Sequence, residues 1–271
     1  MCQHDFLGRR IFQHRNLEKW DLFFNKRIKG FLMEEECHGY ISDLRRAWDG
    51  RIHPQPEGKA LADPRRKKQT IRIAATMISC QERDQLRRRT LKNLAKTDWG
   101  DLPLHIQFDT PGGGNSHQRQ VQASYLALKK SLGFRADYIL FLEDDLDFNR
   151  HLRHNLCHWS PIRRGAVTLA SLYNPQFRDT AWDVRSNTRV VDANAAFGSQ
   201  AFLLSKETVE YVVRRWDDAA GLQDIRIFRL AGRLGSPIFY HAPSLVQHIG
   251  VSSTWGGGFH QAFDFDPVWK A

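Results

Sequence analysis

The sequence predicts an α/β fold in which a mixed, mostly parallel sheet is flanked by helices. First, the stretch 138–142 is an unbroken apolar run, which is typical of a strand covered on both faces. Second, strand-like and helix-like patterns alternate from residue 70 onward. Third, three consecutive carboxylates follow the apolar run, at the strand end where such sheets place their ligand sites.

The expected elements follow from hydrophobic periodicity and from the turn residues between them. Strands of β-branched and apolar residues are expected at 71–78, 102–108, 138–142, 165–172, 201–204, 237–240 and 244–247. Helices with an apolar stripe are expected at 83–94, 117–132, 206–216 and 222–234.

The chain before residue 70 has a different character. Residues 1–50 carry aromatic and aliphatic side chains at helical spacing, which predicts a helical N-terminal extension. Its apolar stripe favours packing on the main domain, and a dimer contact or a surface for an anionic partner are the alternatives. Residues 51–69 are rich in proline and contain the basic run 65–68, which indicates a linker that is either solvated or binds phosphates. The main domain is expected at 70–271.

Bulk properties limit the class of protein. The 271 residues carry a formal net charge of +10, which indicates a polyanionic partner such as a nucleotide, a nucleic acid or an anionic membrane surface. Four scattered cysteines without Cys-x-x-Cys spacing argue against a disulfide framework or a zinc site. No segment has the roughly 20 apolar residues needed to span a bilayer, and no secretory signal is recognisable, so a cytoplasmic location is expected.

The acidic triplet Glu143, Asp144 and Asp145 is the most informative motif. Three adjacent carboxylates repel one another, so burying them is costly unless a cation neutralises them. Mg2+ or Mn2+ accepts carboxylate oxygens and commonly completes its coordination with substrate phosphates. The alternative is that Asp144, Asp145 and Asp147 form a solvated loop that caps a following helix.

This motif resembles the Asp-x-Asp region of glycosyltransferases with the GT-A fold, which reads Glu-Asp-Asp in several N-acetylglucosaminyltransferases. The resemblance implies a GT-A, Rossmann-like domain. It also implies that Asp145 holds the metal, while Glu143 and Asp144 contact the ribose or sugar of a nucleotide-sugar donor.

A second motif supports the same resemblance. Residues 242–250, Ala-Pro-Ser-Leu-Val-Gln-His-Ile-Gly, resemble the Pro-Ser-Leu-x-Gln-His-x-Gly stretch of branching-type N-acetylglucosaminyltransferases and their bacterial relatives. By this match His248 would complete the metal or diphosphate site, since imidazole nitrogen suits Mn2+. On general grounds a histidine after an apolar strand could equally be a hydrogen-bonded core residue.

The order of elements over 70–265 is also similar to a GT-A domain. In that family the first strand ends hold the nucleotide, which here points to Thr76, Arg83 and Asp109, with Arg119 contacting the donor. Taken singly, Arg83 could be a surface residue and Asp109 a turn former. The glycines at 112–114 permit close approach to a ligand or form a flexible loop. Neither a Walker A motif nor a Gly-x-Gly-x-x-Gly motif is present.

An inverting transferase needs a carboxylate base opposite the leaving diphosphate, and Asp224 is the candidate. Its alternative role is the N-cap of the helix at 222–234, and Asp217 and Asp218 are alternative bases. The glycine- and aromatic-rich stretch 252–260 could close over the donor or form a disordered end. Aromatic residues in 263–269 favour ordered packing of the final part.

The sequence therefore predicts a glycosyltransferase that uses a UDP-sugar and Mn2+ or Mg2+. The expected acceptors are a glycan or lipid-linked saccharide, or a hydroxylated base in DNA, the last suiting a phage enzyme in the host cytoplasm. The alternative is a nucleic-acid-binding protein without transferase activity. The sugar, the acceptor, the stereochemical outcome and the oligomeric state are left open.

Overall fold

The computed structural model describes residues 70–110, 112, 114–174, 182–250 and 260–271. The helical extension expected at 1–50 and the linker expected at 51–69, with its basic run, lie outside the described residues. The same holds for all but the last residue of the stretch 252–260.

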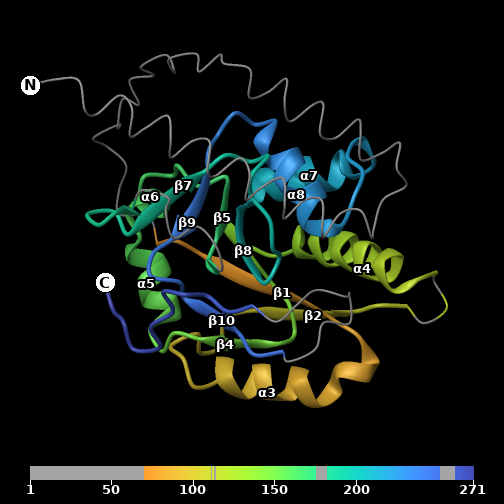
Figure 1. The fold of residues 1–271 in the computed structure, drawn as a ribbon, viewed down its shortest axis with the longest axis horizontal. Coiled ribbons are helices and arrows are strands. Elements are labelled where there is room, and N and C mark those ends of the chain that lie inside the picture. Colours follow the sequence, from red (N-terminus) through yellow and green to blue (C-terminus); the bar gives the residue numbers. More distant parts are fainter. Residues whose placement is uncertain (1–69, 111, 113, 175–181, 251–259) are drawn as a thin grey trace, which may run out of the picture. The chain divides into compact units, whose positions relative to one another are not determined.

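Helices and strands alternate along the described chain, as Figure 1 shows. The strands are β1 (Ile73–Ser79), β2 (Leu104–Phe108), β3 (Tyr138–Leu142), β4 (Leu146–Phe148), β5 (Leu169–Ser171), β6 (Trp182–Asp183), β7 (Thr188–Val191), β8 (Ala201–Ser205), β9 (Ile238–His241) and β10 (Val246–His248). The α-helices are α3 (Asp84–Leu94), α4 (Ser116–Ser131), α5 (Leu152–His158), α6 (Ser160–Arg163), α7 (Lys206–Arg214) and α8 (Gln223–Gly232), with short 3-10 helices η1 (Gln81–Arg83) and η2 (Trp216–Asp218).

A mixed eight-stranded sheet forms the centre of the domain, in the order β2-β1-β3-β8-β5-β9-β7-β6. The expected α/β fold with a mixed sheet flanked by helices is confirmed. Parallel pairing is confined to β1 with β2 and β3, and to β5 with β9. Strand β8 is antiparallel to both β3 and β5, although its apolar sequence suits either direction, because burial on both faces requires the same apolar run in both cases.

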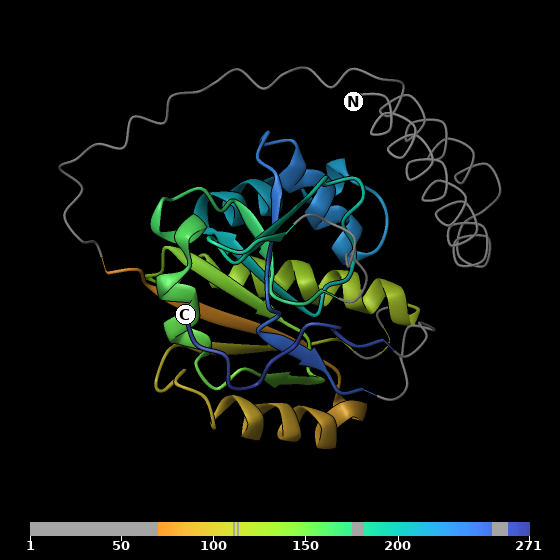
Figure 2. The same ribbon diagram turned by 60° about the vertical axis from the view of Figure 1, so that its left-hand side comes forward.

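Helices cover both faces of this sheet. Helices α4, α7 and α8 lie together on one face, and α3 lies on the other beyond the small sheet formed by β4 and β10 (Figures 1 and 2). Every residue of β1 and of β3 is buried, which explains why neither strand alternates between apolar and polar residues. The buried faces of these strands contribute to the hydrophobic core.

The two-stranded sheet of β4 and β10 was only half expected from the sequence. A strand was predicted at 244–247, whereas its partner β4 was not predicted. The two strands are antiparallel, with Leu146 opposite His248 and Phe148 opposite Val246. This pairing connects the residues after β3 with the C-terminal part of the domain.

The glycine-rich turn before α4 ends in a capping box. The Asn115 side chain accepts a hydrogen bond from the Gln118 amide, and the Gln118 side chain accepts one from the Asn115 amide, both at 3.0 Å. Gly114, with φ of 104°, takes a backbone conformation that favours glycine. The start of α4, which carries Arg119, is therefore fixed by local sequence.

The C-terminal segment is anchored to the domain. The Asn149 side-chain amide donates to the carbonyls of Asp266 and Trp269, at 2.7 and 2.8 Å. The Trp269 ring lies 5.3 Å from the His241 ring, centroid to centroid. The expectation that the final residues pack in order is confirmed for 260–271.

Two further sequence expectations concern the described part of the chain. Cys80 and Cys157 are free thiols, whereas the other two cysteines lie outside the described residues. Within the described segments, no helix combines the length and the apolar character needed to cross a membrane.

Candidate active site

The acidic triplet forms the turn from β3 into β4. Glu143, Asp144 and Asp145 are 8%, 2% and 3% exposed, so the alternative of a solvated loop is wrong. A strand, rather than a helix, follows the triplet, which also removes the helix-capping role. The Glu143 amide donates to the carbonyl of Gln200 at 3.0 Å, and the amide of Ile249 donates to the carbonyl of Asp145 at 2.9 Å. Backbone contacts on both sides thus hold the turn in the domain.

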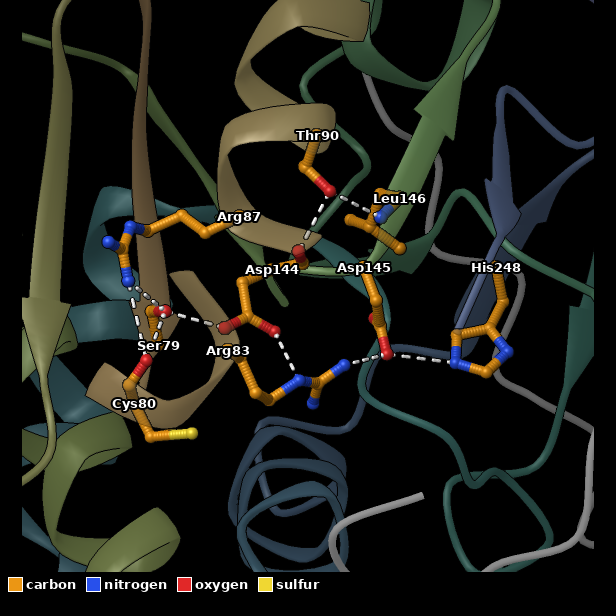
Figure 3. Close-up of polar contacts among 9 residues, drawn as sticks. All are labelled: Ser79, Cys80, Arg83, Arg87, Thr90, Asp144, Asp145, Leu146 and His248. Carbon is orange, nitrogen blue, oxygen red and sulfur yellow. Dashed lines mark hydrogen bonds and ion pairs between the residues drawn. The ribbon is translucent and has the colours of Figure 1, made fainter. Parts of the chain in front are cut away.

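Thr90, in the middle of α3, fastens this turn to the helix. Its hydroxyl donates to the carbonyl of Asp144 and accepts from the amide of Leu146, both at 2.8 Å (Figure 3). The threonine is fully buried. A single hydroxyl therefore satisfies two buried backbone groups that the turn would otherwise leave unpaired.

Arg83 lies between two members of the triplet. Its Nε is 3.2 Å from Oδ1 of Asp144, and its Nη2 contacts Oδ2 of Asp145 (Figure 3). The Arg83 side chain is only 12% exposed. Arg83 ends η1 and directly precedes α3, so the connection after β1 brings a fixed positive charge to two buried carboxylates. The alternative of a surface residue is wrong for Arg83.

Asp144 has a second partner at the end of β1. The Ser79 hydroxyl donates to Oδ2 of Asp144 at 2.5 Å. Arg87, one turn after Arg83, donates to the Ser79 hydroxyl at 3.2 Å and to the carbonyl of Cys80 at 3.3 Å. The first strand end, the first helix and the acidic triplet thus form one hydrogen-bonded cluster, part of which Figure 3 shows.

His248, at the end of β10, contacts the third carboxylate of the triplet. Its Nε2 lies 3.0 Å from Oδ2 of Asp145, and its Nδ1 lies 3.1 Å from the carbonyl of His260. A carbonyl can only accept, so Nδ1 carries a proton and donates. The nitrogen that faces Asp145 can hold a second proton and pair with the carboxylate, or it can bind a cation through its lone pair.

Two more side chains support His248 from the C-terminal segment and from the end of β5. The His260 ring stacks on the His248 ring with centroids 4.7 Å apart. The Tyr173 hydroxyl lies 2.6 Å from Nδ1 of His260. These contacts fix the orientation of the His248 ring, as the outer partners of metal-binding histidines commonly do.

Glu143 faces the opposite side of the turn, towards α8. The Ser199 hydroxyl donates to Oε1 of Glu143, and the Gln223 side-chain amide donates to that hydroxyl at 2.7 Å. All three residues are buried. Gln223 is the first residue of α8, so the start of this helix is linked to the triplet through one serine.

Asp224 follows Gln223 and contacts the same loop. Its Oδ2 accepts from the Gly198 amide at 3.0 Å, and its Oδ1 accepts from the Ile225 amide at 2.8 Å. Leu222, rather than Asp224, is the N-cap residue of α8, so the N-cap alternative is wrong. The loop at 198–199 therefore separates the Asp224 carboxylate from Glu143.

Burial and mutual charge shift the acid-base properties of the triplet. Burial and the neighbouring charge of Asp145 raise the pKa of Glu143 to about 7. Burial raises the pKa of Asp144 to about 6, although Arg83 and Ser79 oppose the change. Burial also acts to raise the pKa of Asp145, but His248 and Arg83 outweigh it and hold this pKa below its ordinary value. The pKa of His248 is correspondingly raised by Asp145, against the opposing effect of burial.

A small pocket that opens to solvent adjoins the cluster. Its polar lining comes from the ends of β1, β2 and β3, from η1 and from α4, and the strand ends are where α/β sheets place their ligands. The lining residues are Ile78, Ser79, Cys80, Arg83, Asp109, Gln120, Ala123, Glu143 and Asp144.

Of the residues expected to bind a nucleotide, Asp109 and Arg119 meet at this pocket. Arg119 Nη1 lies 3.1 Å from Oδ2 of Asp109, and Oδ1 of Asp109 is buried with no hydrogen-bond partner among the described residues. Thr76 lies elsewhere. Its hydroxyl is buried between the sheet and α4, 3.5 Å from the carbonyl of Ala127, and the structure does not bring it to the pocket.

The donor set around Asp145 can be compared with the needs of a divalent cation. Asp145 and His248 would hold such a cation with one carboxylate and one imidazole. Within the described residues, no three His, Cys, Asp or Glu side chains converge on one metal position. Oδ1 of Asp145 is buried without a hydrogen-bond partner among the described residues. A Cβ on Gly250 would lie 2.6 Å from Oδ2 of Asp145 and 3.0 Å from Nε2 of His248, so glycine leaves this space open. A carboxylate with an imidazole fits Mn2+ or Mg2+ whose other positions are filled by phosphates.

Several residues of the cluster were not predicted from the sequence. Ser79, Thr90 and Ser199 are common residue types without a motif, and their roles depend on contacts with distant segments. Gln223 could have been considered, since it precedes Asp224 at the start of a predicted helix.

Comparison with known proteins identifies no family. No family model matches the chain, and no curated protein does. Among solved structures, a glycosyltransferase involved in glycosylation of the major capsid of PBCV-1 aligns with a TM-score of 0.44 and 11% identity, covering 66% of this chain and 94% of that chain. A mutant of Drosophila beta-1,4-galactosyltransferase 7, in complex with manganese, UDP-Gal and xylobiose, aligns with a TM-score of 0.43 and 12% identity, covering 66% and 71%. Neither similarity is strong enough to assign an activity to this chain.

Proposed function

We propose that this protein is a metal-dependent glycosyltransferase that moves a sugar from a nucleotide-sugar donor, a UDP-sugar, to a hydroxyl acceptor. One observation carries the proposal. Asp145, at the end of a buried central strand, lies 3.0 Å from His248, and both belong to the two motifs that resemble GT-A glycosyltransferases. The pocket beside them is lined by the ends of three neighbouring strands.

The donor would bind in this pocket. Asp109 is buried there and can accept a hydrogen bond from a base or ribose, while Arg83 can pair with phosphate oxygens. Arg119 lies against Asp109 and orients its carboxylate. Glu143 and Asp144 complete the wall and are placed to accept hydrogen bonds from ribose or sugar hydroxyls.

Asp145 and His248 would hold Mn2+ or Mg2+. A divalent cation bound there would stabilise the negative charge that develops on the diphosphate leaving group. The chain's own contribution is to fix both ligands, because the β4–β10 pairing positions Asp145 and His248, and the carbonyl of His260 orients the imidazole.

An inverting reaction also requires a base that removes the proton of the acceptor hydroxyl. Asp224 is our candidate. Its carboxylate lies at the first turn of α8 and contacts Gly198, and the next residue, Ser199, donates to Glu143. The candidate base therefore lies one loop away from Glu143, which is proposed to contact the sugar.

For the acceptor we propose a glycan or a lipid-linked saccharide, with a hydroxylated base of phage DNA as the second candidate. The net charge of +10 suits an anionic acceptor of either kind. A DNA acceptor would additionally require an extruded base and binding that weakens steeply with salt. We further propose that the protein acts in the cytoplasm.

The proposal is tested by measuring the thermal unfolding midpoint with UDP, GDP, CMP and ADP, each with and without Mn2+. A ligand that binds the native state raises this midpoint. A rise with UDP that requires Mn2+ is expected. A protein that responds to none of the nucleotides, but is stabilised by DNA or RNA, would instead be a nucleic-acid-binding protein.

A further inference from the structure

Arg83 contacts the carboxylate that a metal at this site would bind, at the oxygen that faces His248. Its Nη2 contacts Oδ2 of Asp145, the oxygen that lies 3.0 Å from Nε2 of His248. Figure 3 shows the Asp145 carboxylate between the guanidinium of Arg83 and the imidazole of His248. A cation bound by Asp145 and His248 would therefore meet a permanent positive charge in direct contact with its own ligand.

We propose that Arg83 is a built-in counter-ion that competes with the divalent cation for Asp145, and that cation binding releases this arm of Arg83 towards the diphosphate of the donor. The inference rests on the proposed function, because it assumes that a divalent cation and a diphosphate bind here.

The electrostatics of the buried turn explain why such a counter-ion is needed. Glu143, Asp144 and Asp145 are all less than 9% exposed, and like charges this close are unfavourable without compensation. Arg83 compensates two of them at once through Nε and Nη2. The guanidinium thus keeps the turn in its folded arrangement while the cation is not bound.

The contacts of each carboxylate indicate how an exchange can occur without unfolding the turn. Asp144 retains the hydroxyl of Ser79 at 2.5 Å, and the carbonyl of Asp144 remains bound to Thr90. Asp145 gains the cation in place of Nη2. The site therefore loses one ion pair, between Arg83 and Asp145, while the other contacts persist.

The pocket beside the triplet can provide a new anionic partner for the released guanidinium. Arg83 lines the pocket. Two other carboxylates of its lining, Asp109 and Glu143, are already paired with Arg119 and with Ser199. A diphosphate beside the cation would supply the anionic partner that Arg83 loses, and arginine binds phosphate well. The cation breaks the ion pair of Arg83 with Asp145, and the diphosphate gives Arg83 a new anionic partner. Cation and nucleotide should therefore strengthen each other's binding.

The test is direct binding of Mn2+, measured by calorimetry and by the signal of free Mn2+ in electron paramagnetic resonance, with and without UDP. Arg83→Gln removes the competing charge and should raise the affinity for Mn2+ alone by about tenfold or more. In the wild type, UDP should strengthen Mn2+ binding by about 5- to 100-fold, and this gain should shrink in Arg83→Gln.

Arg88→Gln is the matched control, since it removes the same charge from α3, the helix that directly follows Arg83. Arg88 has a side chain that is 77% exposed and pairs with Asp84, away from the triplet. Its affinity for Mn2+ should stay within about twofold of the wild type, because a distant exposed charge is screened. Arg83→Lys keeps the charge but cannot contact both carboxylates as a fork. Its affinity for Mn2+ should be intermediate between those of the wild type and Arg83→Gln. If Arg83→Gln does not fold, the Mn2+ affinity of Arg83→Lys tests the competition.

The outcomes separate the two ideas. Mn2+ binding by Arg83→Gln or Arg83→Lys that is no tighter than in the wild type overturns the competition, even if the wild type binds Mn2+ and UDP. If these variants bind Mn2+ more tightly than the wild type, the competition is upheld. If UDP at the same time does not change Mn2+ affinity in any of the proteins, the proposed UDP-sugar donor is overturned. Absence of Mn2+ binding in every folded protein overturns both.

Discussion

Nε2 of His248 lies 3.0 Å from Oδ2 of Asp145, although 103 residues separate the two along the chain. The antiparallel pairing of β4 with β10 produces this contact, because His248 stands opposite Leu146, the residue after Asp145. A slip of one residue in this pairing would turn His248 to the other face of the small sheet. The candidate metal site therefore depends on the register of two three-residue strands.

Asp145→Asn should remove the Mn2+-dependent part of nucleotide binding while the domain stays folded. The amide is neutral and a poor ligand for a hard cation. In the wild type, a ligand at a hundred times its Kd should raise the free energy of unfolding by about 2.7 kcal/mol, and this increase should disappear in Asp145→Asn. Thermal unfolding with UDP and Mn2+ measures this. Asp147→Asn is the control, since the Asp147 carboxylate accepts from the Phe148 amide in its own strand. Retained Mn2+-dependent binding by Asp145→Asn would remove Asp145 as ligand.

Gly250→Ala should weaken Mn2+ binding. The added methyl group would lie 2.6 Å from Oδ2 of Asp145 and 3.0 Å from Nε2 of His248, so one ligand must move. A loss of about 10- to 100-fold in affinity is typical when the orientation of a metal ligand is disturbed. Calorimetric titration with Mn2+ tests this. In the control, Gly133→Ala, the methyl group meets only the carbonyl of Lys130 at 3.5 Å, and affinity should be unchanged.

Thr90→Val should destabilise the domain by about 2–4 kcal/mol, because it leaves the Asp144 carbonyl and the Leu146 amide without their buried partner. Thr90→Ser keeps the hydroxyl and should cost only about 1 kcal/mol for the lost methyl group. Unfolding in urea gives both values. Equal losses in the two variants would mean that packing, rather than the two hydrogen bonds, explains the role of Thr90.

Glu143 should make the stability of the domain depend on pH. Its pKa rises from 4.5 to about 7 on folding, so the folded state disfavours the ionised form. The wild type should therefore lose stability relative to Glu143→Gln as the pH rises from 4.5 to above 7, by up to about 3 kcal/mol. Urea unfolding across this range measures the difference. Glu210→Gln, at an exposed position of α7, should follow the wild type. A difference between wild type and Glu143→Gln that does not vary with pH would contradict the shift.

Asp224→Asn should retain donor binding and lose sugar transfer. The asparagine oxygen can still accept from the Gly198 amide, so the loop should keep its place, but the amide cannot remove a proton. Loss of a general base typically lowers the rate by about 100- to 10,000-fold. Thermal unfolding with UDP and Mn2+ measures binding, and turnover of a UDP-sugar measures transfer. Loss of transfer in Asp217→Asn instead would move the role of base to Asp217.

The pattern of neighbouring residues was sufficient to predict the central strand β3 and the acidic triplet that follows it. The apolar run of β3 and the carboxylates after it are adjacent in sequence, and burial on both faces requires such a run. The helix α4 was equally predictable, because the capping residue Asn115 and its partner Gln118 are only three residues apart. By contrast, β4 and the hairpin of β6 and β7 were missed.

By itself the sequence determined the α/β class and the position of the acidic triplet at a strand end, because both depend on residues that are neighbours in the chain. Only the tertiary structure decided the partners of that triplet. Arg83 and His248 reach Asp145 across 62 and 103 residues. Thr76 lies in the middle of β1, and its hydroxyl is buried against α4 rather than at the pocket. Strand pairing and side-chain direction determine such contacts, and neither is encoded in the spacing of a motif.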